Sequence, residues 1–578
     1  MSERPISGSY RPSIMGTHGM VASGHYLATQ AGARILARGG NAVDAGVAAG
    51  LCLAVLHIDM VNLAGVAPII VYLAEEDRVL TISGLGRWPK AASVAYFKEH
   101  CGGKIPPGVL RCITPGSPDA WITALERYGT LRLAEVMEEP LRLAAEGFPM
   151  HPLMASNLRD AVGQFTKWPS SAAVLMPNGR LPEAGEIFAQ PDLARTIRRL
   201  LDAESGARQS GRQAGLRAAR DLFYRGDIAR EIAAFYASQG GLLTYDDLAA
   251  FQVQVEEPVR ARFREYEVFT CGPWCQGPVL LQMLSLLQGV DLKALGHNTL
   301  AYVHLVTEAM KLCFADRDRY YGDPRVVEVP MDALLAPAYA EERRRLIGER
   351  ACPEMPPAGR ILGFGGAVTR AAEPAAAGGG DLGGGDTSYV CVVDRHGNAF
   401  SATPSDSSWD GPVIPGLGFV PSTRGSQSWA VPGHASCVAP AKRPRLTPNP
   451  ALARRGREWI MPFGAPGGDL QPQGMLQVFL NHTVFGMSIQ EAVEAPRFVT
   501  HSFPGSFEPH PYYPGRLDIE RPIGAVTGEA LSARGHRVEW LPELSIGTAG
   551  VCAISADLGR GILYGGADPR RAARAMGW

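Results

Sequence analysis

A glycine-rich segment that ends at a strand-forming run constrains this chain more than any other feature. Residues 371–386 have the sequence AAEPAAAGGGDLGGGD, and the run TSYVCVVD begins at Thr387. The first segment can bury little apolar surface, so we expect it to be flexible. The second is rich in β-branched and aromatic residues and predicts a strand, followed by a turn over 395–398 and another strand over 399–402.

Two interpretations of this junction differ in function. Glycine- and alanine-rich sequence is usually an interdomain linker, and composition alone favours that interpretation. The alternative is a self-processing site between Asp386 and Thr387. A threonine hydroxyl is a poor nucleophile without a base beside it, but breaking this peptide bond would free the α-amino group of Thr387. An α-amine has a pKa near about 8, so one residue could supply both the nucleophile and the general base.

The composition is that of an ordinary globular protein. The 578 residues are 46% hydrophobic and 20% charged, with a formal net charge of -1. No basic stripe is present, so we expect no nucleic-acid partner. The first twenty residues lack the pattern of a signal peptide, and the longest apolar stretch, 45–56, is too short to cross a bilayer. We therefore expect no membrane association, a cytoplasmic location, and reduced thiols for the ten scattered cysteines.

Local patterns predict a chain of mixed helices and strands. Apolar residues at helical spacing predict helices over 29–38 and 301–320, and Asn41 is the expected N-cap of another helix. Apolar runs on either side of a polar turn predict strands over 69–73 and 79–82.

Several charged or thiol-bearing groups are expected to be structural. Residues 193–220 and 316–319 have the charge patterns of solvated helices. Cys271 and Cys275 have no second Cys/His pair that would complete a zinc site. His304 has no visible partner and is expected to be structural. A threonine that supplies its own base needs neither a metal nor an organic cofactor, so we expect none.

Over nearly its whole length, the chain resembles the γ-glutamyltransferase family of N-terminal-nucleophile hydrolases. The junction at Asp386 and Thr387 is one of several matching blocks, whose order and spacing make the resemblance specific. The other blocks are GMVA at 19–22, GGNAVDA at 39–45, TPG at 114–116, YGTL at 128–131, EAMK at 308–311, ADR at 315–317, GDP at 322–324, VVD at 392–394, GNA at 397–399, PGG at 466–468 and ADPR at 567–570.

The resemblance implies an α+β fold of a particular kind. The family has a four-layer αββα sandwich, in which two sheets pack face to face and helices cover the outside. It also implies self-cleavage into a large segment, 1–386, and a small segment, 387–578. Both segments would form one intertwined fold.

The resemblance further assigns catalytic roles. Thr387 would be the nucleophile, and Ser405 stands where the family has a second threonine that hydrogen-bonds it. Gly467 and Gly468 match the glycines whose backbone N–H groups stabilise the tetrahedral intermediate. Without the resemblance, Ser405 would be an ordinary loop serine and the two glycines a plain turn.

The family's glutamate-binding positions are mostly altered in this chain. The family's early arginine precedes a proline by four residues, whereas Arg87 is the nearest arginine here and is out of that register. Ser407 replaces an asparagine, and Thr447 belongs to a Leu-Thr pair in place of two serines. Gln427 falls near the aspartate that pairs with the substrate amine, and Arg424 is close by. A neutral amide cannot form an ion pair with an ammonium group, and a nearby arginine repels one.

In these substitutions the chain is similar to divergent family members such as oxamate amidohydrolase and cephalosporin-acylase-like proteins. We expect a small anionic or neutral amide substrate without a free α-amino group, and a processed heterodimer whose further association is left open. Arg87 and Arg424 are candidate anion-binding residues, although a structural ion pair explains either one equally well. Two alternatives remain: a genuine γ-glutamyltransferase or glutathione hydrolase with a rearranged clamp, and an unprocessed, non-catalytic binding protein.

Overall fold

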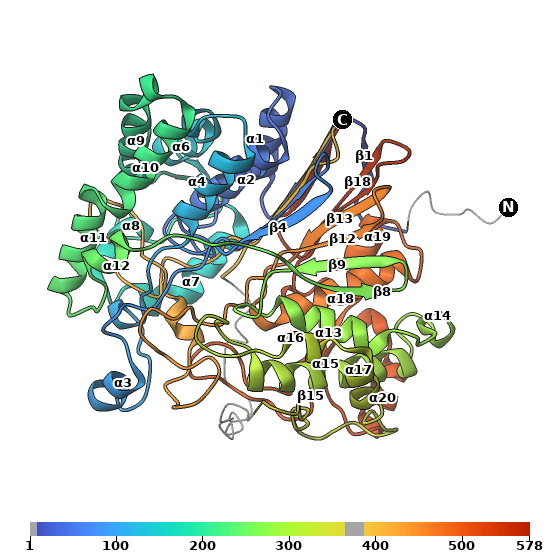
Figure 1. Ribbon diagram of the computed structural model, residues 1–578. Helices are drawn as coiled ribbons and strands as arrows, with labels where there is room; N and C mark the ends of the chain where they lie inside the picture. The colour runs from blue at the N-terminus through green and yellow to red at the C-terminus, as the bar shows by residue number, and fades with distance from the viewer. Residues whose placement is uncertain (1–7, 365–385) are drawn as a thin grey trace.

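Two seven-stranded antiparallel sheets form the centre of the molecule (Figure 1). The computed structural model describes residues 8–364 and 386–578, so most of the glycine-rich segment that we expect to be flexible lies outside the described residues. The first sheet has the order β19 (Arg574–Gly577), β2 (Gly19–Ser23), β10 (Val390–Asp394), β11 (Ala399–Ala402), β3 (Ile69–Leu73), β4 (Arg78–Ile82) and β7 (Val255–Glu256). The second has the order β1 (Ile14–Gly16), β18 (Ile562–Ala567), β17 (Cys552–Asp557), β13 (Trp459–Gly464), β12 (Ala451–Arg455), β9 (Tyr266–Thr270) and β8 (Val259–Phe263).

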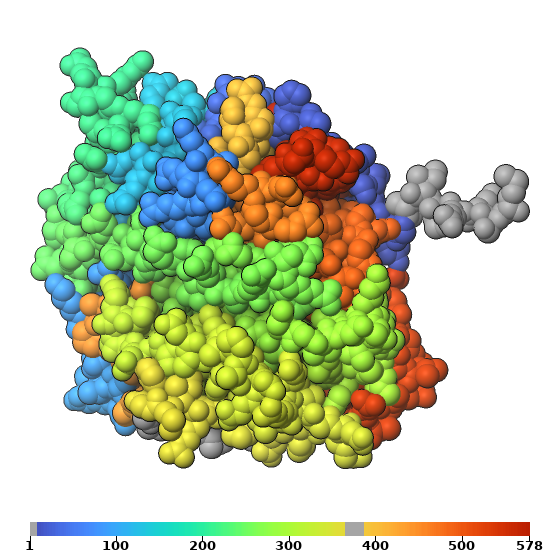
Figure 2. All heavy atoms as spheres, turned by 45° about the vertical axis from the view of Figure 1, so that its right-hand side comes forward, coloured from blue at the N-terminus to red at the C-terminus, as the bar shows by residue number. Residues whose placement is uncertain are grey.

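Both sheets combine strands from before and after Thr387. The central strand β10 pairs with β2 on one side and with β11 on the other, so that Val390 lies opposite both Ser23 and Ala402. In the second sheet, β1, β8 and β9 precede the junction and the other strands follow it. Figure 2 shows the same interleaving at the surface, where orange and red segments lie between blue and green ones. The two parts of the chain therefore form one fold.

Helices lie on the outside of both sheets (Figure 1). Beside the first sheet are α1 (Tyr26–Ala37), α2 (Ala42–Leu56), α4 (Ser117–Tyr128), α6 (Glu138–Glu146), α7 (Pro152–Phe165), α9 (Pro191–Gly206), α10 (Arg212–Tyr224) and α11 (Asp227–Ser238). Beside the second are α13 (Gly277–Leu287), α15 (Leu300–Tyr320), α17 (Pro337–Arg344), α18 (Gln471–Thr483), α19 (Ile489–Glu494) and α20 (Ala525–Ala533). The smaller elements are α3 (Val94–Cys101), α5 (Leu133–Val136), α8 (Pro169–Leu175), α12 (Tyr245–Ala249), α14 (Leu292–Leu295), α16 (Met331–Leu334), β5 (Phe148–Pro149), β6 (Ile187–Phe188), β14 (Phe498–Thr500), β15 (Arg516–Glu520) and β16 (Arg537–Leu541).

The two faces of each sheet pack against different apolar layers, because side chains alternate along the strands. In β10, Val392 packs with α1 and α2, whereas Cys391 and Val393 pack into a cluster that both sheets share. In β13, Ile460 faces that shared cluster and Met461 faces the helices of the second side. Because side chains along a strand alternate between faces, each sheet must be covered on both sides. This arrangement confirms the predicted four-layer αββα sandwich.

Several local predictions are confirmed. The strands expected over 69–73 and 79–82 coincide with β3 and β4, and the helix expected over 301–320 is α15. Asn41 caps α2, since its Oδ1 accepts hydrogen bonds from the N–H groups of Val43 and Asp44 at 2.9 and 3.0 Å. Every residue of α2 is buried.

The two predictions of solvated charged helices need correction. The 193–220 region forms α9 and α10, and both helices bury an apolar face. In α15, residues 316–318 are at most 1% exposed, which contradicts the expected solvated face. Their charges are neutralised by groups far away in the sequence, such as Asp469, which pairs with Arg317. A charge pattern along one helix does not reveal such partners.

The cysteines agree with expectation. All ten are free thiols, and Cys271 and Cys275 are both buried. Among the described helices, none is both long enough and apolar enough to cross a bilayer.

Candidate active site

Thr387 lies three residues before the first residue of β10, a central strand of the first sheet. Thr387 and Ser405 form an antiparallel bridge, and the Ser388 N–H donates to the Pro404 carbonyl at 3.0 Å. Both hydroxyl-bearing residues are fully buried, and Thr387 Oγ1 lies 2.8 Å from Ser405 Oγ. The sheet therefore fixes two hydroxyl groups side by side.

The backbone carbonyl of Asp386, directly before Thr387, points into a set of donors. Its oxygen accepts hydrogen bonds from Ser405 Oγ at 2.5 Å, from Arg424 Nη2 at 3.0 Å and from the Asp406 N–H at 3.3 Å. Arg424 Nη2 also donates to Ser405 Oγ and lies 2.8 Å from Oδ2 of the Asp386 carboxyl group. One guanidinium thus contacts both the residue before the junction and the hydroxyl beside Thr387.

Burial perturbs the carboxyl groups around Arg424. Removal from water raises the pKa of Asp386 to about 7, while Arg424 lowers it and Asp406 raises it further. Burial also raises the pKa of Asp406, against the opposing effect of Arg424. Arg424 is 1% exposed, and its Nη1 has no hydrogen-bond partner among residues 8–364 and 386–578. The buried cation therefore keeps an unused donor.

The predicted Pro-Gly-Gly turn follows β13 and adjoins Thr387. Gly467 and Gly468 have φ angles of 120° and 54°, which residues with a side chain rarely adopt. Gln276 Nε2 donates to the Gly468 carbonyl at 2.8 Å and holds the turn. Pro466 and Thr387 line the same buried cavity of about 10 Å³, roughly the space of one water molecule.

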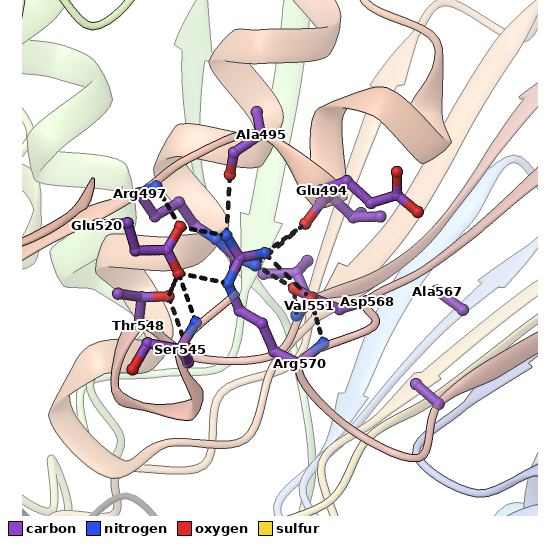
Figure 3. Close-up of polar contacts among 12 residues, drawn as sticks. Glu494, Ala495, Arg497, Glu520, Ser545, Thr548, Val551, Ala567, Asp568 and Arg570 are labelled. Carbon is purple, nitrogen blue, oxygen red and sulfur yellow. Dashed lines mark hydrogen bonds and ion pairs between the residues drawn. The ribbon is translucent and has the colours of Figure 1, made fainter. Parts of the chain in front are cut away.

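A buried ionic network lies behind this turn (Figure 3). Arg570 donates to both carboxylate oxygens of Glu520, at 2.8 and 2.6 Å, and Asp568 joins Arg570 to Arg497. Burial alone would raise the pKa of Asp568, but Arg497 and Arg570 outweigh it and hold that pKa below its usual value. All four side chains are at most 3% exposed.

The network positions the loop that packs against the turn. Glu520 Oε1 accepts hydrogen bonds from the Ser545 N–H at 2.9 Å and from Thr548 Oγ1 at 3.0 Å (Figure 3). The next residue, Ala549, lies 3.4 Å from where a Cβ on Gly467 would stand. The ADPR block thus supports the glycine turn from behind.

A cavity of about 290 Å³ opens beside Asp386. Ser407 lines it, together with aromatic side chains that make much of its wall apolar. These are Trp409, Phe503, Phe507 and Tyr513. Three acidic groups of the wall pair with arginines, in the pairs Asp386–Arg424, Asp410–Arg111 and Asp469–Arg317, and the fourth, Glu508, lies 3.3 Å from His510 Nε2. The cavity wall is therefore largely apolar, and most of its charged groups are paired.

The other three predicted substrate-binding residues, Gln427, Thr447 and Arg87, fall into two groups. Gln427 and Thr447 bind each other, with Gln427 Nε2 donating to Thr447 Oγ1 at 2.7 Å and the Thr447 N–H donating to Gln427 Oε1 at 3.2 Å. Arg87 points elsewhere, since its guanidinium donates to the Gln252 carbonyl at 3.4 Å and stacks 5.9 Å from the Phe251 ring centroid. Burial lowers the pKa of Arg87 to about 10.

Asp406 is a site residue that sequence reasoning missed. Its φ of 102° is uncommon for a residue with a side chain. Its carboxylate accepts hydrogen bonds from Ser422 Oγ at 2.5 Å and from the Thr423 N–H and Oγ1 at 3.1 and 2.9 Å. It thereby fastens the loop that carries Arg424 to the segment after β11 that carries Ser405. Its place directly after Ser405 was the one available signal.

One group in the described part of the chain approaches metal-ligand geometry. Ligand atoms of His304, Glu308 and His536 lie within 4.8 Å of one another. His304 Nδ1 is 2.9 Å from His536 Nε2, however, and Glu308 accepts a hydrogen bond from the Lys311 ammonium at 2.7 Å. A cation would have to displace this ammonium, so the group serves as an internal hydrogen-bond network.

The fold indicates the class of enzyme to which this chain belongs, and comparisons with known proteins show its family. A four-layer αββα sandwich of this kind is the fold of the N-terminal-nucleophile hydrolases, which the solved structures below share. Residues 28–578 match the model of the Gamma-glutamyltranspeptidase family, and the chain belongs to this family. It is therefore an enzyme of the amide hydrolase and acyltransferase class.

Curated relatives cover nearly the whole chain. The Acylase ACY 1 proenzyme of Pseudomonas sp. (strain SE83) is 33% identical over 545 residues, 92% of this chain and 89% of that protein. The Glutathione hydrolase-like YwrD proenzyme of Bacillus subtilis (strain 168) is 32% identical over 570 residues, 98% of this chain and 99% of that protein. The Oxamate amidohydrolase proenzyme of Klebsiella pneumoniae is 28% identical over 578 residues, with the same coverage of 98% and 99%.

Solved structures agree with this assignment. The protein LmbA2991HD is 36% identical and superposes with a TM-score of 0.92, covering 99% of this chain and 100% of that one. A cephalosporin acylase from Bacillus halodurans is 29% identical with a TM-score of 0.85, covering 100% and 98%. The expected similarity to the acylase-like and oxamate-hydrolysing members of the family is confirmed.

Proposed function

We propose that this chain is a self-processing N-terminal threonine amidohydrolase that is cut between Asp386 and Thr387. The observation that carries the proposal is the 2.8 Å contact of Thr387 Oγ1 with Ser405 Oγ, which itself donates to the Asp386 carbonyl. Three relatives are named proenzymes, which supports processing. The products, 1–386 and 387–578, would remain a heterodimer because both contribute strands to each central sheet.

The mature enzyme would work through an acyl-enzyme. The freed α-amine of Thr387 takes the proton of its own hydroxyl, and the hydroxyl oxygen attacks the substrate carbonyl carbon. The N–H groups of Gly467 and Gly468 stabilise the oxyanion, and one such donor typically lowers a barrier by about 3–4 kcal/mol. The amine then gives the proton to the leaving nitrogen. Water releases the acyl group from the ester, whereas an amine acceptor would give transfer.

The surroundings of Arg424 favour a substrate with an anionic group and no free α-amine. Cleavage would free Arg424 Nη2 from Asp386, beside an Nη1 without a partner among the described residues. A carboxylate can accept two hydrogen bonds from such a guanidinium, whereas an ammonium would face a buried cation. Ser407 offers a hydroxyl on the cavity wall.

The other predicted substrate-binding residues need a rearrangement to take part. Gln427 and Thr447 would have to break their hydrogen bonds to each other before either could bind the substrate. Arg87 would have to leave the Gln252 carbonyl. We therefore rank all three below Arg424 as substrate contacts.

We expect monoamides of short dicarboxylic acids, including oxamate, to be better substrates than glutathione. Their carboxylate matches Arg424, while the α-amino group of glutathione does not, so kcat/KM should differ by about tenfold or more. Steady-state hydrolysis of both substrates measures this, and Thr387→Ala protein gives the background. Comparable or faster turnover of glutathione would instead support a genuine γ-glutamyltransferase with a rearranged clamp.

The uncut form should lose stability as pH rises. The pKa of Asp386 is about 7 in the folded chain, above its usual value of 3.8, so the folded state retains a proton that the unfolded state has lost. The stabilisation of the folded state by this bound proton is fully present below about pH 4 and is lost progressively as pH rises to about 7. Urea unfolding of Thr387→Ala at pH 5 and pH 8 measures it, with Thr387→Ala/Asp386→Asn as the matched control. Equal pH dependence of the two variants would contradict the raised pKa.

A further inference from the structure

The carbonyl oxygen of Asp386 already lies among donors that could bind an oxyanion. Ser405 Oγ, Arg424 Nη2 and the Asp406 N–H donate to it over 2.5, 3.0 and 3.3 Å. This oxygen belongs to the peptide bond that the proposed function requires to break. A tetrahedral intermediate at its carbon would place negative charge on this oxygen, where donors 2.7–3.1 Å away are typically effective.

Arg424 is held in place from several sides. It is 1% exposed, and its guanidinium carbon lies 5.3 Å from the ring centroid of Phe507. The preceding residue, Thr423, is fixed by two hydrogen bonds to the Asp406 carboxylate, at 3.1 and 2.9 Å. Behind the loop, a Cβ on Gly425 would stand 2.2 Å from the Arg111 carbonyl, so the backbone has no room to shift that way. A cationic donor with preset geometry binds an oxyanion more strongly than a neutral one.

We propose that Arg424 is a catalytic residue of the self-cleavage reaction. It is the charged member of an oxyanion hole that serves the Asp386 carbonyl and is separate from the hole that Gly467 and Gly468 form for substrates. This role rests on the proposed self-processing and goes beyond it, because it assigns a second task to the guanidinium. Arg424 first stabilises the cleavage intermediate, and once Asp386 has left it is free for the substrate's anionic group.

Self-cleavage needs no reagent other than water. Thr387 Oγ1 bonds to the Asp386 carbonyl carbon, the C=O electron pair moves onto the oxygen beside Arg424, and the hydroxyl proton leaves through Ser405 Oγ. The C=O bond then re-forms, the bond to the Thr387 nitrogen breaks, and that nitrogen takes up the proton as a free amine. Water hydrolyses the resulting ester, which restores the Thr387 hydroxyl and leaves Asp386 with a terminal carboxylate.

The test is the rate of cleavage in freshly made full-length chains. Chains are produced by cell-free synthesis and followed by denaturing gel and intact mass. Arg424→Gln should slow first-order cleavage by about 100-fold or more, as does the loss of one oxyanion donor in other enzymes. Arg424→Lys keeps the charge and should lose less. Arg343→Gln is the matched control, since it removes another buried arginine, 3.4 Å from Asp316, and should cleave at the wild-type rate.

Hydroxylamine separates the two chemical steps, because it cleaves esters directly. It should not restore cleavage of Arg424→Gln, since the slowed step precedes the ester. Full restoration would overturn the role of Arg424, as would wild-type cleavage rates in folded Arg424→Gln and Arg424→Lys, with folding checked by size-exclusion chromatography and thermal unfolding. A wild-type chain that stays uncut would overturn the proposed function as well, so the two failures are distinguishable.

Discussion

Replacing Thr387 by alanine is expected to leave the chain uncut and without amide hydrolase activity. The substitution removes the hydroxyl that lies 2.8 Å from Ser405 Oγ, and no α-amine is freed if the chain stays whole. Both the nucleophile and the base of the proposed mechanism are then missing. Activity should fall to the uncatalysed background, a loss of several orders of magnitude.

Thr387→Ser is the matched control for this experiment. It keeps a hydroxyl and, after cleavage, an α-amine, so it should retain both cleavage and measurable hydrolysis at reduced rates. Denaturing gels report cleavage, and hydrolysis of a dicarboxylic monoamide reports activity. Hydrolysis by uncut Thr387→Ala well above the buffer rate would contradict the assignment of Thr387 as nucleophile.

The second large effect is expected from Arg570→Met, which breaks the buried ionic network of Figure 3. Arg570 bonds Glu520 at 2.8 and 2.6 Å and Asp568 at 3.1 Å, and none of the three is more than 3% exposed. Removing Arg570 leaves the buried Glu520 carboxylate without its cation and leaves Asp568 with Arg497 alone, so the free energy of unfolding should fall by about 3–5 kcal/mol.

This prediction is measured by urea unfolding in the Thr387→Ala background, where a single chain unfolds. Arg38→Met is the control, because Arg38 pairs with Glu138 at the surface and both side chains are more than half exposed. Its unfolding midpoint should barely change. Equal midpoints for Arg570→Met and Arg38→Met would show that the network contributes little.

Local sequence signals predict much of the fold around the site. The TSYVCVVD run gives β10 because its branched residues suit a strand buried on both faces, as Val392 and Cys391 show. Asn41 is recognisable as a cap because its side-chain oxygen accepts hydrogen bonds from the N–H groups two and three residues later. The resemblance to the family adds the pairing of Thr387 with Ser405, which no local pattern reveals.

The electrostatic part of the site could not be predicted in this way. Asp386 and Arg424 are 38 residues apart, and their contact depends on how the strands pair. Arg317 meets Asp469 across 152 residues, which is why a run of alternating charges proved to be buried. Arg87 has a sequence position near the family's arginine, but packing directs its guanidinium to Gln252.

The roles proposed for Thr387 and Arg424 both require that the chain cuts itself between Asp386 and Thr387, and intact-mass analysis of the purified wild-type protein tests this cleavage. Two chains are expected, of 386 and 192 residues, with the smaller beginning at Thr387 (578 minus 386 gives 192). A single 578-residue chain that persists for days, or a cut at any other bond, would contradict it.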